Sequence, residues 1–258
     1  AGFDLAMPRF FILLCLSVLC TAPAYSVEQF SYKILNKKPQ DRANFVQGLE
    51  ILEGTLYVSC GNYGQSRLMR YHFDDMRLKD SKTLSPRLFA EGVSVLGEHI
   101  YQLTWRERMM LVFNKSTMEP VEWFPIVGQG WGLTNDGTQL IYSDGSDQIH
   151  FLSNQSRAIS HSISVTENGR PVRKLNELEW IDGKIWANVW QTDRVVIINP
   201  QSGEVEGNID LSGLLPASDR HATTDVLNGI ARNPDDGSIW VTGKHWPWLY
   251  QIELLPLN

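Results

Sequence analysis

The sequence has few cysteines, no long hydrophobic stretch and no excess of positive charge, and each shortage excludes a class of protein. It contains three cysteines in 258 residues, Cys15, Cys20 and Cys60, too few for a fold stabilised by disulfides. The net charge of -6 gives no support to nucleic-acid binding, which needs a basic face. The apolar run from Phe10 to Leu19 is shorter than the ~20 residues that span a bilayer. Stability must therefore come from a hydrophobic core.

The N-terminal segment has the pattern of a targeting sequence. Residues 1–6 precede Met7, and we interpret them as an expression scar. The apolar run that follows Met7 ends at Ala22-Pro-Ala, a small-x-small cleavage pattern, so residues 7–24 are predicted to be a signal peptide. An uncleaved anchor is the alternative. We expect residues 25–258 to form a single domain that is secreted or periplasmic and carries no membrane attachment once mature.

One sequence phrase recurs five times in that domain. In each copy a polar or aromatic residue is followed by a small one, then by an apolar strand, a turn and a second strand. The corresponding positions, which we call the first ring, are Gln47, Glu91, Trp131, Asn176 and Asn228, 40 to 52 residues apart. Glu53-Gly54, Asp136-Gly137 and Asp182-Gly183 lie between alternating strands and predict hairpins. No segment sustains a 3.6-residue apolar period, so few helices are expected.

Repeats of this length, with about four strands each, predict an all-β fold, a five-bladed β-propeller. The stretch Glu28–Leu35 alternates like a strand but precedes the first repeat. We expect it to supply the outer strand of the last blade, which would close the ring and cover a sheet edge. No long unpaired edge then remains, and we expect a monomer.

A second register follows from the first. Fourteen residues after each first-ring position lies the end of the second strand, and in the fifth repeat the turn is two residues longer. The resulting second ring is Gly61, Trp105, Gly145, Trp190 and Lys244. Equivalent positions in a propeller lie at equal height and radius. One mouth would therefore hold a carboxylate, an ammonium, three carboxamides and three indoles, which describes a small-molecule site.

Several long segments carry a family resemblance, among them Phe45-Val-Gln-Gly-Leu-Glu, Phe89-Ala-Glu-Gly, Gly130-Trp-Gly-Leu and Leu175-Asn-Glu-Leu-Glu. At these residues the chain resembles the plant-type glutaminyl cyclases and their bacterial relatives, over nearly all of the predicted mature domain. The resemblance implies a five-bladed propeller that cyclises the N-terminal glutamine of peptides or proteins without catalytic zinc. It places the site at Phe45, Gln47, Phe89, Glu91, Trp105, Trp131, Asn176, Trp190 and Lys244. One departure is Ala90, where the family usually has glycine.

The chemistry of such a reaction suggests a role for each residue. Glu91 is the only acid in the two rings and is expected to take a proton from the attacking amine and give it to the departing ammonia. Lys244 and Asn176 are expected to stabilise the oxyanion, and Gln47 to hold the substrate backbone. The tryptophans would form the wall of the pocket, supported by Phe45 and Phe89.

The sequence also gives expectations for a cofactor, a structural ion and two arginines. The six histidines show no paired metal-ligand spacing, so no cofactor is expected to be required. A structural calcium in the central channel is left open. Arg170 and Arg173 lie in a turn-like segment and are expected to staple loops rather than bind substrate.

Two other functions remain as alternatives. The first is a non-catalytic propeller that binds peptides or sugars, since a fold does not fix a function. The second is a metal-dependent, lactonase-like hydrolase. That enzyme would need several carboxylates around one cation, whereas the two rings hold one carboxylate and a lysine.

Overall fold

A computed structural model describes residues 26–257, and this part of the chain is built almost entirely of strands. The expected scar and signal peptide lie outside the described residues. The strands are β1 (Glu28–Pro39), β2 (Val46–Leu52), β3 (Thr55–Cys60), β4 (Arg67–His72), β5 (Leu78–Thr83), β6 (Ala90–Leu96), β7 (His99–Thr104), β8 (Met109–Asn114), β9 (Pro120–Pro125), β10 (Leu133–Asn135), β11 (Gln139–Ser143), β12 (Gln148–Ser153), β13 (Ile159–Ser164), β14 (Thr166–Glu167), β15 (Arg170–Pro171), β16 (Leu175–Ile181), β17 (Lys184–Val189), β18 (Arg194–Ile198), β19 (Val205–Asp210), β20 (Leu227–Arg232), β21 (Ile239–Gly243) and β22 (Trp248–Pro256). A single 3₁₀ turn, Ala217–Asp219, is the one helical element in this part. None of its helices is long and apolar enough to cross a membrane.

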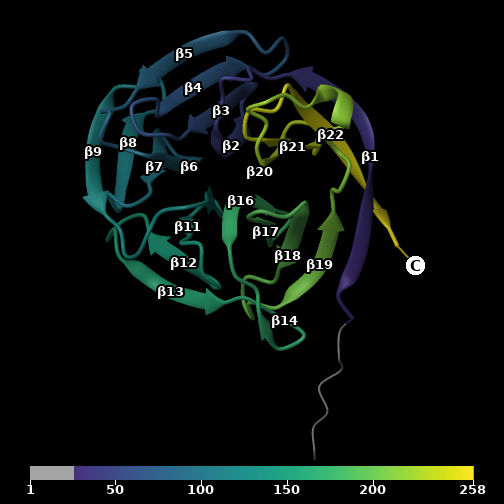
Figure 1. Cartoon of the computed structure of the whole chain (residues 1–258). Coiled ribbons are helices and arrows are strands. Elements are labelled where there is room, and N and C mark those ends of the chain that lie inside the picture. Colours follow the sequence, from purple (N-terminus) through teal and green to yellow (C-terminus); the bar gives the residue numbers. More distant parts are fainter. Residues whose placement is uncertain (1–25, 258) are drawn as a thin grey trace, which may run out of the picture.

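The strands form antiparallel sheets in chain order. β2–β5, β6–β9 and β10–β13 each make a four-stranded sheet, while β16–β19 and β20–β22 belong to one eight-stranded sheet that β1 joins together. Figure 1 shows these units arranged around a common centre, with the first strand of each nearest the centre and the last on the outside. The arrangement is propeller-like.

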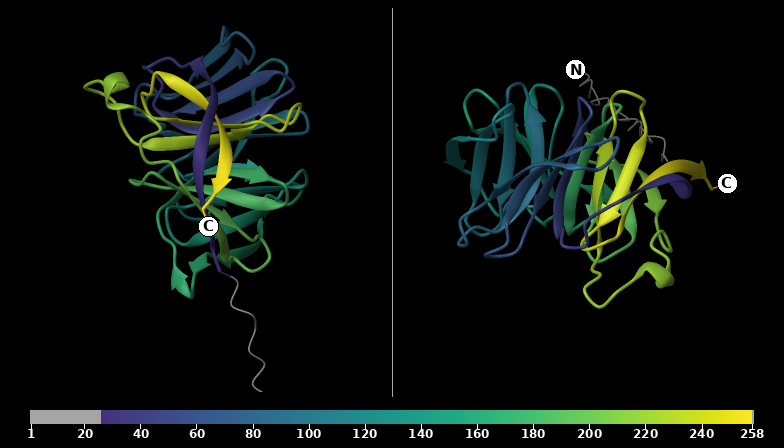
Figure 2. Two further views of the ribbon diagram at one scale, coloured as in Figure 1. Left: turned by 90° about the vertical axis from the view of Figure 1, so that its right-hand side faces the viewer. Right: turned by 90° about the horizontal axis from the view of Figure 1, so that it is seen from above.

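The N-terminal strand pairs with the C-terminal one. β1 runs antiparallel to β22 from Phe30 to Pro39, and its first residues, Glu28 to Phe30, also pair in parallel with β19. Figure 2 shows β1 and β22 side by side. The strand continues four residues past the alternation seen in the sequence, because its register shifts between Ile34 and Asn36 and hides the period-2 pattern.

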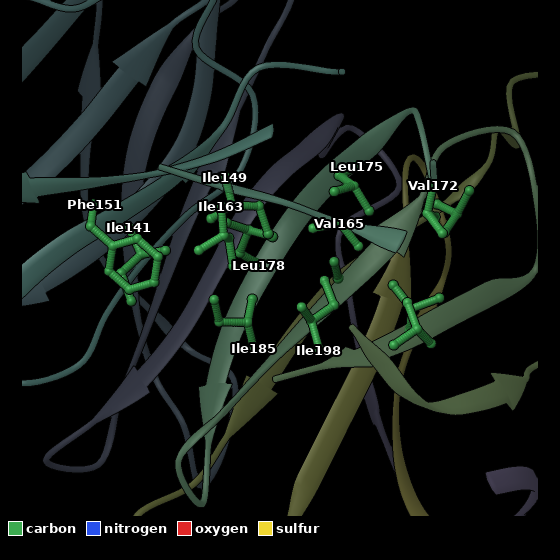
Figure 3. Close-up of a cluster of buried hydrophobic side chains, with 14 residues drawn as sticks. Ile141, Ile149, Phe151, Ile163, Val165, Val172, Leu175, Leu178, Ile185 and Ile198 are labelled. Carbon is green, nitrogen blue, oxygen red and sulfur yellow. The ribbon is translucent and has the colours of Figure 1, made fainter. Parts of the chain in front are cut away.

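The predicted turns and the alternation of the strands account for the core. Glu53 (φ 50°) and Gly54 (φ 67°) both have left-handed backbone, as do Asp182 and Gly183, the geometry of the tight hairpins that their sequences predict. The apolar side chains of each sheet pack against the next sheet. Figure 3 shows one such cluster, in which Ile141 and Ile149 meet Leu178 and Ile185 from the neighbouring unit. These interfaces hold neighbouring units together.

The small residue of the repeated phrase lies where neighbouring inner strands touch. A Cβ atom on Gly48 would lie 2.4 Å from the backbone nitrogen of Val93, and one on Gly132 would lie 1.9 Å from the carbonyl oxygen of Asn176. Only glycine permits this approach. The fourth copy has Glu177 at this position, and its buried carboxylate accepts the N–H groups of Leu49 (3.2 Å) and Ile230 (2.8 Å). The inner strands are therefore fixed against one another immediately beside the first ring.

Candidate active site

The register deduced from the sequence is present in the backbone. Four second-ring residues donate their N–H to the carbonyl oxygen of the residue two places before the matching first-ring position. These bonds are Gly61 to Phe45 (3.0 Å), Trp105 to Phe89 (3.0 Å), Trp190 to Lys174 (2.9 Å) and Lys244 to Val226 (2.9 Å). The equivalence of these four positions is confirmed, including the longer turn before Lys244.

Most first-ring residues lie at irregularities of the strand pairing. The register shifts at Gln47 in β2, at Glu91 in β6, at Asn176 in β16 and at Asn228 in β20. Such bulges turn a side chain away from the regular alternation and are common beside active sites. All four side chains are buried. The local structure thus aims one polar group from each of four inner strands into the interior.

Glu91 is 5% exposed and is held by a relay of amides. The Gln47 Nε2 atom donates to its carboxylate at 3.3 Å, and Asn228 Nδ2 donates in turn to Gln47 Oε1 at 3.4 Å. Burial raises the pKa of Glu91 well above its ordinary value, although the positive charge of Lys244 opposes that rise. A carboxyl group in this setting binds a proton far more readily than one in water.

Lys244 and Asn176 carry donor groups that nothing in the described chain uses. Lys244 is 4% exposed and its Nζ lies 4.5 Å from the centre of the Phe45 ring. Neither this ammonium nor the Asn176 side-chain amide hydrogen-bonds to any residue between 26 and 257, and the Asn176 atom that is fully buried without a partner is its acceptor oxygen, Oδ1. Burial lowers the pKa of Lys244, and the charge of Glu91 counteracts this. Buried polar groups normally have partners, so these two are available to a ligand.

The aromatic residues form a continuous wall. Phe45 packs edge-on against Phe89, with ring centres 6.3 Å apart, and Phe89 packs against Trp105 at 5.3 Å. Trp131 and Trp190 form a T-shaped pair at 5.5 Å. These contacts are favourable beyond the area they bury and fix the ring orientations.

The two glycines of the second ring make room for this wall. A Cβ atom on Gly61 would lie 2.5 Å from the Phe89 ring, and one on Gly145 would lie 2.5 Å from the Trp131 indole. The absence of a side chain at these two positions therefore leaves space that Phe89 and Trp131 fill.

The comparisons with known proteins assign the family. A model of the glutamine cyclotransferase family matches residues 10–254. This chain belongs to that family. It is 36% identical over 228 residues to a glutaminyl-peptide cyclotransferase of Arabidopsis thaliana, an alignment that covers 86% of this chain and 71% of that protein. The crystal structure of Myxococcus xanthus glutaminyl cyclase superposes with a TM-score of 0.84 and 31% identity, covering 90% of this chain and 100% of that one. The WD40 β-propeller domain of Doa1, 9% identical with a TM-score of 0.50, shares the general fold alone.

In this member of the glutamine cyclotransferase family, side-chain contacts and charges link six of the nine predicted site residues, Phe45, Gln47, Phe89, Glu91, Trp105 and Lys244, while Trp131 and Trp190 pair with each other. Asn176 is linked through the backbone. Its carbonyl oxygen accepts the hydroxyl of Ser143 (2.7 Å), and that hydroxyl oxygen accepts the N–H of Gly132 (2.8 Å), next to Trp131. Gln47 differs from expectation in one respect, because its amide is already bonded to Glu91 and Asn228.

Two further residues of the site were missed by the sequence analysis. The Gln129 Oε1 atom accepts the indole N–H of both Trp105 (2.8 Å) and Trp131 (3.1 Å) and so joins the two aromatic pairs. It lies two places before Trp131, the position that Phe45 occupies in the first repeat, so a third register would have found it. The second is Glu107, whose carboxylate accepts the N–H of Phe89 (3.2 Å). No repeat spacing signals Glu107.

Within residues 26–257, no group of three or more His, Cys, Asp or Glu side chains is arranged to hold a metal ion. Cys60 is buried with a free thiol, and burial raises its pKa to about 12. A thiol in this state is a poor nucleophile and a poor metal ligand.

Proposed function

We propose that this chain converts the N-terminal glutamine of peptides or proteins to pyroglutamate and releases ammonia. Membership of the glutamine cyclotransferase family and the 36% identity to a glutaminyl-peptide cyclotransferase support this activity. The observation that carries the chemistry is Glu91, the one acidic residue of the two rings, which is buried and lies close enough to Lys244 for the lysine charge to oppose the rise in its pKa.

The reaction is intramolecular, and this determines what the protein has to supply. The α-amine of the substrate attacks its own γ-carboxamide carbon, a new C–N bond closes a five-membered ring, and the old C–N bond to ammonia breaks. Holding the folded-back rotamer supplies much of the rate gain. We assign this role to the wall formed by Trp105, Trp131 and Trp190, which also excludes water.

Glu91 is proposed to move the proton. Its carboxylate takes a proton from the attacking amine and then gives it to the departing nitrogen, so one group acts first as base and then as acid. Such transfer contributes about 10²–10⁴-fold. The raised pKa suits a group that must both accept and release a proton. The amide relay through Gln47 supports the carboxyl orientation, and we propose that Gln47 positions Glu91 as well as the substrate backbone.

Lys244 and Asn176 are proposed to stabilise the negative charge that grows on the γ-oxygen during attack. Preorganised donors in a site that excludes water are the most effective form of such stabilisation. Neither donor has to give up a protein partner to do this, because neither has one among residues 26–257. The ammonium of Lys244 is also fixed over the Phe45 ring, a cation–π contact.

We propose that catalysis needs no metal ion. The supporting observation is the donor set, one carboxyl group with an ammonium nearby, which is unsuited to a divalent cation. Turnover should therefore survive prolonged EDTA treatment. Loss of turnover that added zinc restores would overturn this proposal. If the channel held a structural calcium, EDTA would instead lower the melting temperature. Turnover at temperatures where the protein stays folded would then be unchanged.

The finer architecture and the setting of the protein are also proposals. We infer five blades, each with one phrase on its innermost strand, and closure of the ring by β1 beside β22, a pairing that supports the idea. Removing residues before Gln40 should then lower the melting temperature sharply.

We further propose that the protein is a monomer, which size-exclusion chromatography with light scattering would test. We also propose that it is secreted or periplasmic, which fractionation of the expressing cells would test.

A turnover assay separates the candidate functions. The purified protein is incubated with Gln-β-naphthylamide and ammonia is measured. Release of ammonia with formation of the pyroglutamyl product supports the cyclase. Binding of the substrate without turnover would favour the non-catalytic propeller, and hydrolysis of lactones that depends on calcium would favour the lactonase-like enzyme.

A further inference from the structure

A polar cavity of about 470 Å³ lies at the connection that leads from β13 into β16. The residues that matter in its lining are Glu167, Arg170, Arg173, Val189 and Arg194. We call it the arginine cavity. It belongs to none of the contacts that build the site around Glu91, and the proposed mechanism does not use it.

The arginine cavity opens on the face that carries the site. Its hairpin, β14–β15, lies in the connection that leads into β16, whose second residue is Asn176. Figure 1 shows β14 at the rim of the ring, between β13 and β19. Val189 directly precedes Trp190, and Arg173 directly precedes Lys174, whose Nζ lies 5.5 Å from the Trp190 ring. Two lining residues of the cavity, Val189 and Arg173, are therefore adjacent in sequence to residues that belong to the aromatic wall or contact it.

The three arginines of the arginine cavity differ in whether they have a partner. Arg194 is fixed by Glu167 (2.7 Å) and Asn208 (2.6 Å), so the one acidic side chain of the lining is already paired. Arg170 and Arg173 are exposed, and their side chains make no hydrogen bond or ion pair with any residue of the described range 26–257. No such contact supports the expectation that these two arginines staple loops. Two guanidinium groups remain free at one cavity of a chain whose net charge is -6.

The chemistry of this cavity fits a carboxylate. A guanidinium group presents a planar fork of donors that matches a carboxylate and binds it through two parallel hydrogen bonds. An extended peptide advances about 3.3–3.6 Å per residue. A substrate whose glutamine lies against Trp190 would thus carry its next few residues past Val189 and over the cavity.

We propose that Arg170 and Arg173 form a subsite for an acidic side chain located two to four residues into the substrate. This inference rests on the proposed cyclase function and adds a substrate preference to it. The enzyme would then favour peptides of the type Gln-x-Glu over their neutral counterparts. The preference would act on binding rather than on the chemical step, because the subsite is remote from the reacting atoms.

The test uses matched peptides. The parent is Gln followed by four alanines, and single Glu residues are placed at position 2, 3 or 4, each compared with Gln at the same position. At low ionic strength, Glu at one position should raise kcat/KM about two- to fivefold through KM, the range for arginine–carboxylate contacts of limited burial. The advantage should shrink as salt is added.

Three single variants assign the effect. Arg170→Gln and Arg173→Gln should each reduce the advantage of Glu over Gln at least twofold. Arg77→Gln is the control, since Arg77 is exposed in the β4–β5 turn at the opposite end of the strands and its loss changes the net charge equally. The control should keep the full advantage. A wild-type enzyme without any preference, or an equal loss in the Arg77 variant, would overturn the subsite.

A binding experiment separates failure of the subsite from failure of the proposed function. Calorimetry with the pyroglutamyl forms of the same peptides compares Glu with Gln without any turnover. Tighter binding of the acidic peptide that is lost in Arg173→Gln supports the subsite even if no cyclisation occurs. Turnover of the parent peptide with equal binding of both product peptides supports the cyclase and rejects the subsite.

Discussion

Replacing Glu91 with glutamine tests the proposed proton transfer most directly. The substitution keeps the size of the side chain and an oxygen that can accept the Gln47 amide at the present 3.3 Å. It removes the group that binds and releases the proton. Removing a general acid–base group typically costs about 10²–10⁴-fold, equivalent to raising the barrier by about 3–5 kcal/mol. We expect kcat to fall at least about 100-fold, with KM little changed.

The same substitution should not harm the fold. Burial raises the pKa of Glu91, so the folded state binds its proton more tightly than the unfolded state does. The corresponding stability is complete below the unfolded pKa and is lost as the pH rises through the folded pKa. A neutral glutamine avoids that loss. We therefore expect Glu91→Gln to be at least as stable as the wild type at pH 8.

Ammonia release with Gln-β-naphthylamide gives kcat, and denaturant unfolding at pH 8 gives the stability. Glu98→Gln, in the exposed turn of the same hairpin, is the matched control and should keep full activity. Retention of more than a tenth of wild-type kcat by the Glu91 variant would refute the assigned role. A large fall in stability together with kcat would leave the loss of activity attributable to misfolding, which Glu91→Asp and Glu91→Ala would then resolve by their own unfolding curves.

Three more substitutions test Lys244, the pocket wall at Trp131 and the buried Glu50. Lys244→Met should lower kcat about 10²–10³-fold and move the acidic limb of the kcat/KM profile to higher pH, because the lysine charge lowers the pKa of Glu91; an unmoved limb would contradict the coupling. Gly145→Ala should raise KM several-fold and change the tryptophan fluorescence, since its φ is 82° and the new Cβ would lie 2.5 Å from the Trp131 indole; unchanged kinetics would argue against Trp131 as pocket wall. Burial raises the pKa of Glu50 from 4.5 to about 7, so the wild type should lose about 3 kcal/mol of its free energy of unfolding as the pH rises through this range. Glu50→Gln should remove most of this pH dependence, and denaturant unfolding at pH 5 and pH 8 would check this.

The repeat explains why so much of the site could be predicted from the sequence. Because each unit repeats the same hairpin, a spacing found in one copy transfers to the others, and the second-ring N–H bonds follow it even across the longer turn before Lys244. The polar residues at these positions were conspicuous because strands that pack on both faces otherwise carry apolar side chains. The prediction of the rings needed neither side-chain geometry nor distances.

Interactions that break the repeat could not be predicted in this way. Glu107 reaches Phe89 from the loop between β7 and β8. The continuation of β1 to Pro39 depends on its pairing with β22, whose partner lies at the other end of the chain. The free state of Arg170 and Arg173 depends on Glu167 having bound Arg194 instead. Each of these contacts depends on which residues the fold brings together, and the repeat spacing carries no information about that.

The glycines of the phrase link the architecture to the chemistry. Intramolecular cyclisation gains from positioning to within fractions of an ångström, and a site assembled from five separate strands would lose this if the strands could slide. Contacts such as Gly48 to Val93, and the two N–H bonds to the Glu177 carboxylate, lock the inner strands one residue away from Gln47 and Asn176. Close backbone packing thus lies directly beside the proposed catalytic groups. A substitution of Gly48 or Gly132 should consequently damage turnover through misplacement of the first ring, at a distance from every reacting atom.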